Sequence, residues 1–247
     1  MAKESGLGDR LLVGGFDLGD DIGAVGNIGG GPAALELTGI TKSAFERIGG
    51  LRDGRMELSV FFNDAIGQEH VVLSALPRTD TILSYLHGST LGNAAACLNA
   101  KQIGYDPTRG NDGSLTIAVE AQGNQYGLEW GRQLTAGKRT DTTATNGSSV
   151  DGGAASSFGL QAYVQLLAFT GTSVTIKLQS SSDDGAGDAF SDVTAGSFGA
   201  LTAVGAARIE TARNAAIERY LRVVTTGTFS NAVFSVVVVR NATEVLF

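Results

Sequence analysis

The chain has 247 residues, of which 43% are hydrophobic, and its formal net charge is −7. An acidic balance disfavours a protein that grips nucleic acid, because such proteins carry a basic excess. The sequence has no apolar run near the roughly 18 residues that a membrane-spanning helix needs, and residues 1–9 are too polar for a secretory signal. The single cysteine, Cys97, excludes an intrachain disulfide framework, and we expect it to be a small buried hydrophobe.

Glycine is about twice as frequent as usual and proline is scarce, while Val, Ile, Leu and Phe are abundant. This mixture predicts an all-β chain of short strands joined by glycine turns. Residues 1–32 are rich in Gly and Asp, and we expect one strand at 10–13 within an N-terminal arm that is mobile when alone. Alternation of apolar and polar residues then predicts strands at 33–40, 54–62, 81–86, 93–103, 114–122 and 126–134. Gly123 and Asn124 are expected to form a hairpin turn between the last two strands.

One segment, at residues 64–76, predicts a helix. Asp64 is expected to cap its start and Pro77 to stop it. Gln68 and Glu69 are expected to face water, whereas an apolar stripe is formed by Ile66, Val72, Leu73 and Leu76. The first half of the chain is therefore predicted to be a β unit with one flanking helix.

Residues 135–157 change character, because they contain almost no large apolar side chain. We expect a linker or long loop there, between two structural units. The strand pattern restarts afterwards, and it predicts strands at 158–169, 173–179, 189–193, 201–209, 219–225 and 231–240. Such a series of short strands predicts a second unit that is a β-sandwich or jelly roll.

The sequence offers little support for catalysis. The run GNIGGGP at residues 26–32 lacks the Gly-Lys-Ser/Thr ending of a phosphate-binding loop, so a flexible turn is the preferred interpretation. His70 and His87 have no cysteine or second histidine at zinc-ligand spacing, and no serine lies in a Gly-x-Ser-x-Gly elbow. A cysteine–histidine pair stays open, but nothing favours it. We therefore expect no enzyme activity and no cofactor.

Two groups of residues leave a ligand site open. The one metal-like feature is a set of aspartates, Asp183, Asp184, Asp188 and Asp192. Their spacing does not match a calcium-binding loop, and Asp-Gly pairs are common turn formers, so a solvated turn is preferred over a weak calcium site. Three aromatic residues could form a sugar-binding platform, although packing in a β core is their commoner role: Phe61, Tyr126 and Trp130.

Six stretches together carry a resemblance to a known family. They are GGGPAALELTGITKSAFERIGGLRDGRMELSVFFN (29–63), LPRTDTILSYLHG (76–88), LGNAAACLNAKQIGYDPTRGNDGSLTIAVEAQ (91–122), YGLEWGRQLTAG (126–137), SSSDDGAGDAF (180–190) and ERYLRVVTTGTF (218–229). In this combination the sequence resembles the major tail proteins of long-tailed, non-contractile phages of actinobacteria. The resemblance covers nearly the whole chain and is one of overall texture rather than of chemical fingerprints.

The resemblance implies a specific architecture. Tail-tube subunits of this family fold as two packed β-sheets with a flanking helix, six subunits form a ring, and the rings stack into a tube whose inner barrel lines the DNA channel. An immunoglobulin-like or jelly-roll domain often decorates the outside. For this chain the resemblance implies a tail-tube domain with its N-terminal arm at residues 1–137, a linker at 138–157, and a C-terminal β-sandwich decoration domain at 158–247.

A physical argument stands beside the resemblance. An exposed sheet edge is a liability for a monomer, but a ring-forming protein can use it, because strand addition from a neighbour satisfies its backbone N–H and C=O groups. The lumen of such a ring should be weakly acidic and hydrated, so that DNA passes without specific binding. Lumen-facing candidates are the polar members of alternating strands, Arg55, Glu57, Ser59, Ser114, Thr116 and Glu120, although either strand face could point inward. Ring-to-ring contacts are expected from the N-terminal arm and the loop at 39–53, with candidates Lys42, Arg47, Arg52 and Asp53.

The sequence is thus interpreted as a structural virion protein that polymerises into a tail tube through which phage DNA is ejected. Its expected partners are further copies of the chain and other tail proteins such as the tape measure, tail terminator and distal tail proteins, with no membrane. We expect it in the virion, after assembly in the host cytoplasm. Two alternatives stay open, a capsid decoration protein and a carbohydrate-binding virion surface protein whose loop at 183–192 recognises host glycans.

Overall fold

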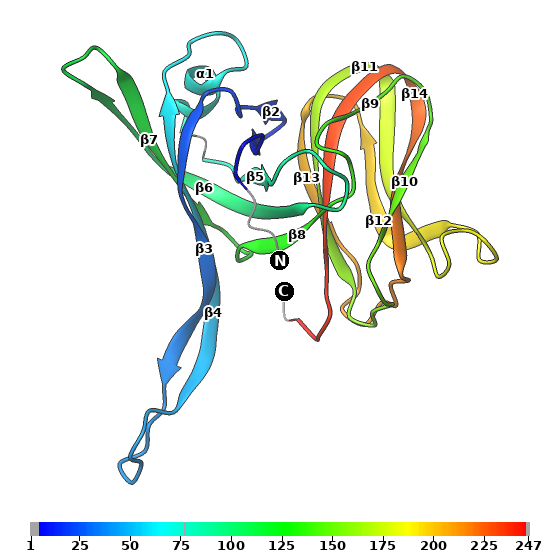
Figure 1. The fold of residues 1–247 in the computed structure, drawn as a ribbon, viewed down its shortest axis with the longest axis horizontal. Coiled ribbons are helices and arrows are strands. Elements are labelled where there is room, and N and C mark those ends of the chain that lie inside the picture. Colours follow the sequence, from blue (N-terminus) through cyan, green and yellow to red (C-terminus); the bar gives the residue numbers. More distant parts are fainter. Residues whose placement is uncertain (1–4, 77, 246–247) are drawn as a thin grey trace. The chain divides into compact units, whose positions relative to one another are not determined.

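The structure, a computed structural model, describes residues 5–76 and 78–245 (Figure 1). Residues 1–4 of the expected N-terminal arm, and Pro77 as the expected helix stop, lie outside the described residues. The all-β prediction with one helix is confirmed. In chain order the elements are β1 (Arg10–Val13), β2 (Phe16–Asp17), β3 (Ile22–Glu36), β4 (Arg47–Phe61), α1 (Glu69–Leu73), β5 (Thr81–Leu86), β6 (Ala94–Arg109), β7 (Leu115–Gly123), β8 (Glu129–Gln133), β9 (Arg139–Asp141), β10 (Asn146–Asp151), β11 (Leu160–Ser181), β12 (Ser191–Leu201), β13 (Gly205–Glu210) and β14 (Tyr220–Arg240).

The described chain divides into two compact units. Unit 1 comprises residues 5–20, 82–97 and 130–245, and unit 2 comprises residues 21–81 and 98–129. This division differs from the predicted domain borders at residues 137 and 158. The difference arises because three separate parts of the sequence supply strands to unit 1, which a search for linkers along the chain does not detect.

Two long antiparallel strands, β11 and β14, form the frame of unit 1. Each was predicted as two short strands, because the alternation of apolar residues is interrupted near the middle. The pairing itself continues there with shifts of register between Leu166 and Ser173. Gly171 and Gly227 lie at this bend with φ of 155° and 122°, and a Cβ atom on either would lie within 2.5 Å of the opposite backbone. The close approach at the bend therefore requires glycine.

The two halves of these strands have different neighbours. The first half of β11 pairs with β13, and its second half pairs with β12. The first half of β14 pairs with β10, and its second half pairs with both β8 and β9. Alternate side chains of both halves meet in one apolar core that includes Leu160, Val164, Val174, Ile176, Leu221, Phe234 and Val236. The halves thus form two layers around a shared core, in agreement with the predicted C-terminal sandwich.

The segment predicted as a linker, residues 138–157, instead contains β9 and β10, and both pair with β14. Polar contacts stabilise these strands in place of apolar alternation. Arg139 donates from Nε and Nη2 to the two carboxylate oxygens of Asp141 at 2.8 and 2.7 Å. The buried Asp141 also accepts the hydroxyl of Thr225 at 2.6 Å. A pattern search finds no strand here, because the side chains that hold it are charged or hydroxylic.

A second core lies on the opposite face of β11 and β14. Tyr163 and Val237 pack there with residues of β1, β5 and the start of β6, namely Leu12, Ile82, Leu86, Ala95 and Cys97. Cys97 is fully buried, as the sequence predicts. The early strands β1 and β5 therefore belong to the same unit as the C-terminal strands.

In unit 2, four strands pair in the antiparallel order β3, β4, β7 and β6. Met56, Leu58 and Val60 of β4 are buried together with Ile117 and Val119 of β7, which confirms the alternation predicted for these strands. The predicted hairpin at Gly123 and Asn124 is wrong. β7 pairs with β4 and β6, and β8 belongs beside β14 and β6.

The helix is much shorter than predicted, because α1 spans Glu69–Leu73. Gly67 has a φ of 78°, which interrupts a right-handed helix, and the N-cap residue is Gln68 instead of Asp64. The predicted faces also change. Ile66 is 96% exposed, whereas Glu69, expected in water, is fully buried.

Glu69 is buried close to a second carboxylate within unit 2. Its Oε2 atom accepts the backbone N–H of Asn63 at 3.4 Å, and its own N–H donates to Asp21 at 3.3 Å. The Oε1 atom has no hydrogen-bond partner among the described residues. Burial raises the pKa of Glu69 above its ordinary value and outweighs the lowering effect of the Asn63 N–H.

We expect Glu69→Gln to raise the free energy of unfolding by about 1 kcal/mol near pH 8 and to change it little near pH 4.5. A raised pKa means that the folded state holds its proton more tightly, so the wild type loses stability as the pH rises through the unfolded and then the folded pKa. The amide keeps an acceptor for Asn63 and carries no charge. Urea unfolding at both pH values checks this, with Glu244→Gln on the exposed surface as the control. Equal destabilisation at both pH values would contradict it.

Candidate assembly surfaces

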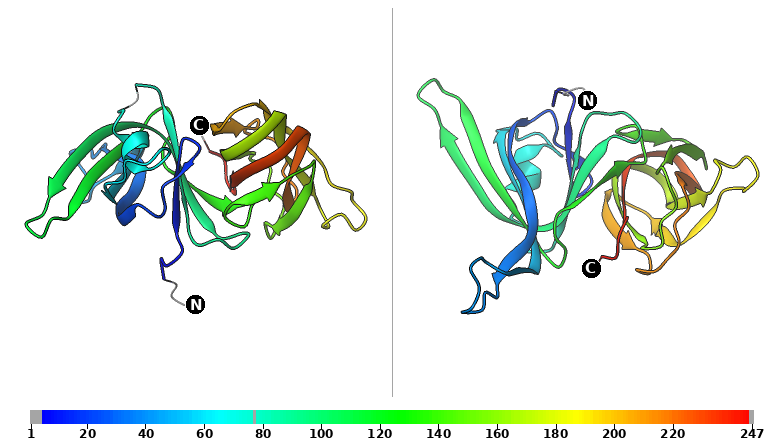
Figure 2. Two further views of the ribbon diagram at one scale, coloured as in Figure 1. Left: turned by 90° about the horizontal axis from the view of Figure 1, so that it is seen from above. Right: turned by 60° about the horizontal axis from the view of Figure 1, so that its bottom comes forward.

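The β3–β4 hairpin extends beyond the rest of unit 2 as a two-stranded arm (Figures 1 and 2). The pairing of β4 with β7 begins at Arg55, so residues 31–53, called the arm below, form a ribbon of two strands and their connecting loop. Six large apolar side chains of the arm are between 48% and fully exposed, and they are Leu35, Leu37, Ile40, Phe45, Ile48 and Leu51. A ribbon of two strands is marginally stable in water, and a contiguous exposed apolar surface marks an interaction site. The arm is therefore a candidate interaction surface.

One face of the arm combines apolar side chains with a carboxylate. Leu35 pairs with Ile48, and the N–H of Leu37 donates to the carbonyl of Glu46 at 2.9 Å. Directly opposite residues of an antiparallel pair share a face. Leu35, Leu37, Ile48 and Glu46 therefore lie on one side of the ribbon, called the arm face below. Glu46 pairs with Lys42 at 2.8 Å, and both side chains are 51% exposed, so this ion pair is weak and can exchange partners.

The four residues predicted to make ring-stacking contacts all belong to the arm. Lys42 pairs with Glu46, and the guanidinium of Arg47 lies 4.6 Å from the ring centroid of Phe45. Asp53 accepts the N–H of Gly54 at 2.7 Å and the amide of Gln122 at 3.3 Å at the base of the arm, next to the exposed Arg52. Their role in ring stacking stays a prediction. Sequence reasoning did not single out the exposed apolar residues between them, Phe45, Ile48 and Leu51, because it predicted a loop there and named only charged candidates.

Five of the six predicted lumen residues share one polar face of the unit 2 sheet. Glu57 of β4 lies directly opposite Glu120 of β7, and the same register places Arg55, Ser59 and Thr116 on that face. Asp106 and Thr108 of β6 join them through their pairing with β7. The sixth candidate, Ser114, lies before β7 in a turn, where its hydroxyl donates to Asp112 at 2.7 Å. Because Met56, Leu58 and Val60 are buried on the opposite face, this polar face is the solvated one.

The polar face carries a net negative charge. Arg55 lies 3.5 Å from Glu57 and Lys101 lies 2.6 Å from Asp80, which leaves the carboxylates of Glu120 and Asp106 as the excess. These side chains are partly or fully exposed, so the face is hydrated. Such a surface repels phosphate groups weakly and offers no cluster of cations to bind them.

The aspartates of the predicted weak calcium site serve the turn that follows β11. Asp183 accepts the backbone N–H groups of Ala186, Gly187 and Asp188 at 2.6–3.2 Å. Asp188 accepts the N–H of Ser182, Asp184 accepts the hydroxyl of Ser149, and Asp192 pairs with Lys177 at 2.6 Å. The lowered pKa values of Asp183, Asp188 and Asp192 follow from these hydrogen bonds. Among residues 5–76 and 78–245 no group of three or more ligating side chains is placed to hold a metal ion.

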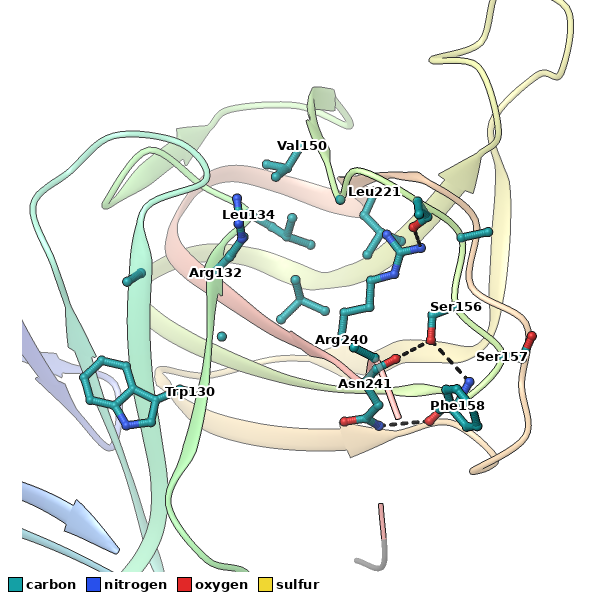
Figure 3. A pocket seen from close by; sticks show the side chains of 17 residues that line it. Trp130, Arg132, Leu134, Val150, Ser156, Ser157, Phe158, Leu221, Arg240 and Asn241 are labelled. Atoms are coloured by element: carbon teal, nitrogen blue, oxygen red, sulfur yellow. Dashed lines mark hydrogen bonds between the residues drawn. The ribbon is translucent and has the colours of Figure 1, made fainter. Parts of the chain in front are cut away.

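Unit 1 contains a cavity of about 670 Å³ between β8, the end of β14 and residues 150–158 (Figure 3). Leu134, Leu221 and Val238 of the main core form its floor. Arg132, Trp130 and Phe158 stand around it, and none of the described residues that line it is acidic. Trp130 is 54% exposed, against the expectation of core packing, and so is Phe61 of unit 2 at 53%. Of the three residues of the possible aromatic platform, only Trp130 lines this cavity.

Hydrogen bonds fix the outer wall of the cavity. Ser156 exchanges two backbone hydrogen bonds with Ile217 at 2.8 and 2.7 Å. The guanidinium of Arg240 donates to the carbonyl oxygens of Ala154, Ile217 and Arg219, and Asn241 donates to that of Phe158. The wall is therefore held open by polar contacts instead of collapsing onto the apolar floor.

Each of the two histidines contacts neighbouring side chains, and the ring of His70 lies 4.7 Å from that of Phe62 between centroids. Nδ1 of His70 lies 2.7 Å from the hydroxyl of Tyr105, and Nδ1 of His87 lies 2.9 Å from Asp9. Burial, together with the nearby Glu69, raises the pKa of Tyr105 to about 12, so its phenol stays protonated. No helix in the described part of the chain is long and apolar enough to cross a membrane.

No family model matches the sequence, and no curated protein matches it. Among solved structures, the chain is similar to the Dit protein (gp 19.1) of phage SPP1, described as a paradigm of the hub adsorption apparatus in phages that infect Gram-positive bacteria. The TM-score is 0.33 at 12% identity, over 93% of this chain and 98% of that chain. The chain is also similar to two structures of the phage p2 baseplate in its activated conformation, each at 10% identity and over 99% of the compared chain. The structure with Sr gives a TM-score of 0.36 over 96% of this chain, and the structure with Ca gives 0.32 over 95%. At these TM-scores the similarity does not establish a common fold.

Proposed function

We propose that the chain is a non-enzymatic structural subunit of a phage tail, and that its copies form stacked rings that build the tail tube. The observation that carries this proposal is the arm. Its exposed apolar side chains, among them Leu35, Leu37 and Ile48, have no cover within the described chain and need a neighbouring molecule. A subunit that reaches to the next copy by an arm makes a head-to-tail contact, and such contacts close into rings or continue into filaments. Six copies per ring follow from the family resemblance.

The polar face of unit 2 supports a lumen. It is a hydrated sheet surface with a small excess of carboxylates, on which Glu57 and Glu120 lie directly opposite each other. In a ring, copies of this face would surround a channel from which DNA phosphates are weakly repelled. The sheet then separates the channel from the buried core around Met56 and Val119.

The proposal places the protein in the virion, after assembly in the host cytoplasm. Its first partner is another copy of itself. Other tail proteins, such as the tape measure, tail terminator and distal tail proteins, would contact the ends of the stack or its interior. DNA would pass along the polar face without specific binding.

Two measurements test the proposal. Negative-stain microscopy of the purified protein should show rings or tubes, and an antibody against it should label intact virions along the tail. A variant whose residues 32–52 are replaced by Asn-Gly removes all six exposed apolar side chains, keeps the pairing of Gly31 with Asp53 and closes it with a two-residue turn. We expect this variant to remain monomeric in analytical ultracentrifugation.

The control replaces residues 110–114 by Asn-Gly, which keeps the pairing of Arg109 with Leu115 and shortens the loop between β6 and β7, outside the arm. This variant should assemble like the wild type. A wild-type protein that stays monomeric at high concentration, or an antibody that labels the phage head, would overturn the tail proposal. Labelling confined to the tail tip would keep a tail protein but exclude the tube.

A further inference from the structure

We propose that the cavity of unit 1 receives the arm face of a second copy of the chain. This inference rests on the proposed function and names the surface on which the arm docks. The described chain leaves the apolar floor of this cavity, formed by Leu134, Leu221 and Val238, uncovered. The inference gives that cavity a role. The subunit contact is then heterologous, with the arm on one copy and its receptor on the next.

The cavity has the construction of a receptor site. Specific sites are concave, mostly apolar and largely preformed, with few polar groups that set orientation. At about 670 Å³ the cavity falls in the size range of such sites. Its wall is fixed before any partner arrives, because Ser156, Arg240 and Asn241 hold residues 152–158 against β14 and against the isolated bridge residue Ile217.

The charge of the cavity selects for an acidic occupant. Arg132 lines it without a hydrogen bond or ion pair to the described residues, and its side chain is exposed. Arg240 contributes a second guanidinium, and no acidic side chain lines the cavity in the described structure. An apolar surface that carries a carboxylate therefore fits better than a purely apolar or a basic one.

The arm face offers that combination within the same chain. Leu35, Leu37 and Ile48 supply three large apolar side chains on one side of a ribbon, and Glu46 stands on the same side. Glu46 gives up only a weak, exposed ion pair with Lys42 when it meets Arg132. A hairpin tip buries a small area, so a single arm–cavity contact is weak. A closed ring is more stable, because each copy makes two such contacts, one through its arm and one through its cavity.

The experiment uses two variants that each lack one half of the contact. Ala155→Trp fills the cavity from an exposed position and keeps the arm intact. Leu35→Lys with Ile48→Lys removes the apolar arm face without adding carboxylates that the cavity favours, and it keeps the cavity. In analytical ultracentrifugation at concentrations where the wild type assembles, each variant alone should stay monomeric. An equimolar mixture should form a heterodimer that does not grow, because only one arm–cavity contact is available.

A charge exchange gives an independent readout. Arg132→Glu alone and Glu46→Arg alone should each weaken assembly about tenfold, and the double variant should recover most of the loss. Ala189→Trp, an exposed position outside the cavity, is the matched control for Ala155→Trp and should assemble normally. Circular dichroism of all variants confirms that they are folded.

The outcomes separate this inference from the proposed function. If Ala155→Trp assembles like the wild type while the arm variant does not, the arm docks elsewhere, and the inference fails although the tail proposal stands. A mixture that stays monomeric also overturns the inference. If the arm variant assembles normally, both the inference and the role of the arm in the proposed function fail.

Discussion

A phage whose subunits carry Glu57→Lys and Glu120→Lys is expected to build tails of normal length and to infect at least about tenfold less efficiently at low salt. The two positions lie opposite each other on the polar face of unit 2. The exchange replaces one like-charged pair by another, so the sheet should tolerate it. In the proposed tube, however, every ring would then present cations to the DNA, and phosphate contacts would hold the DNA in the channel.

The measurements are plaque counts and the rate of DNA release from purified virions at several salt concentrations. Added phosphate contacts make the retention strongly dependent on salt, so release should recover as the salt concentration rises. The control phage carries Asp20→Lys and Glu244→Lys, which make the same change of charge at exposed positions of unit 1. If both phages release DNA at the wild-type rate, the polar face does not line the channel.

Gln165→Leu is expected to lower the free energy of unfolding by about 3 kcal/mol, which corresponds to a Tm lower by about 6–12 °C. Gln165 is buried on β11, and its Oε1 accepts the N–H of Gly15 at 2.7 Å. Its Nε2 donates to the carbonyl of Ile82 at 2.9 Å and to the hydroxyl of Ser84 at 3.1 Å. The leucine would leave the buried N–H of Gly15 without this acceptor and would break the link between β11 and β5.

The chain contains a matched control four residues away on the same strand. Gln161 is as deeply buried as Gln165, but its Nε2 has no hydrogen-bond partner among the described residues. Gln161→Leu removes an unsatisfied donor, so it should leave stability unchanged or increase it. Urea unfolding of both variants checks the pair of predictions. Equal losses would show that the network around Gln165 contributes nothing specific.

The sequence predicted those parts of the fold in which side-chain burial follows strand periodicity. The strand predicted at residues 81–86 coincides with β5, and Met56, Leu58 and Val60 are buried as their alternation requires. The solvated face of β4 followed from the same alternation. Which face of the sheet points into the lumen depends on how several chains assemble, so the residue pattern of one chain does not determine it.

The predictions failed where other forces decide the structure. Polar contacts between Arg139, Asp141 and Thr225 hold strands in the segment predicted as a linker. The left-handed conformation of Gly67 shortens the helix. The segment 39–53 was predicted as a contact loop, but its pairing with residues 31–36 into a ribbon was not, because residues such as Leu35 and Ile48 form strands there without being buried. The cavity depends on contacts between residues far apart in sequence, which local sequence patterns do not predict.

The interleaving of the two units along the sequence sets an order of events during translation. Unit 2 is complete once residue 129 has left the ribosome, and its arm is then ready. Unit 1 must wait for β14, since β1 packs on strands more than 150 residues later and such distant contacts form slowly. Nascent chains therefore display the arm early and finish the cavity last. With the proposed docking, an unfinished chain can insert its arm into the cavity of a finished copy. Because its own cavity is not yet formed, it cannot receive the arm of a further copy, so an incomplete subunit would not propagate the tube.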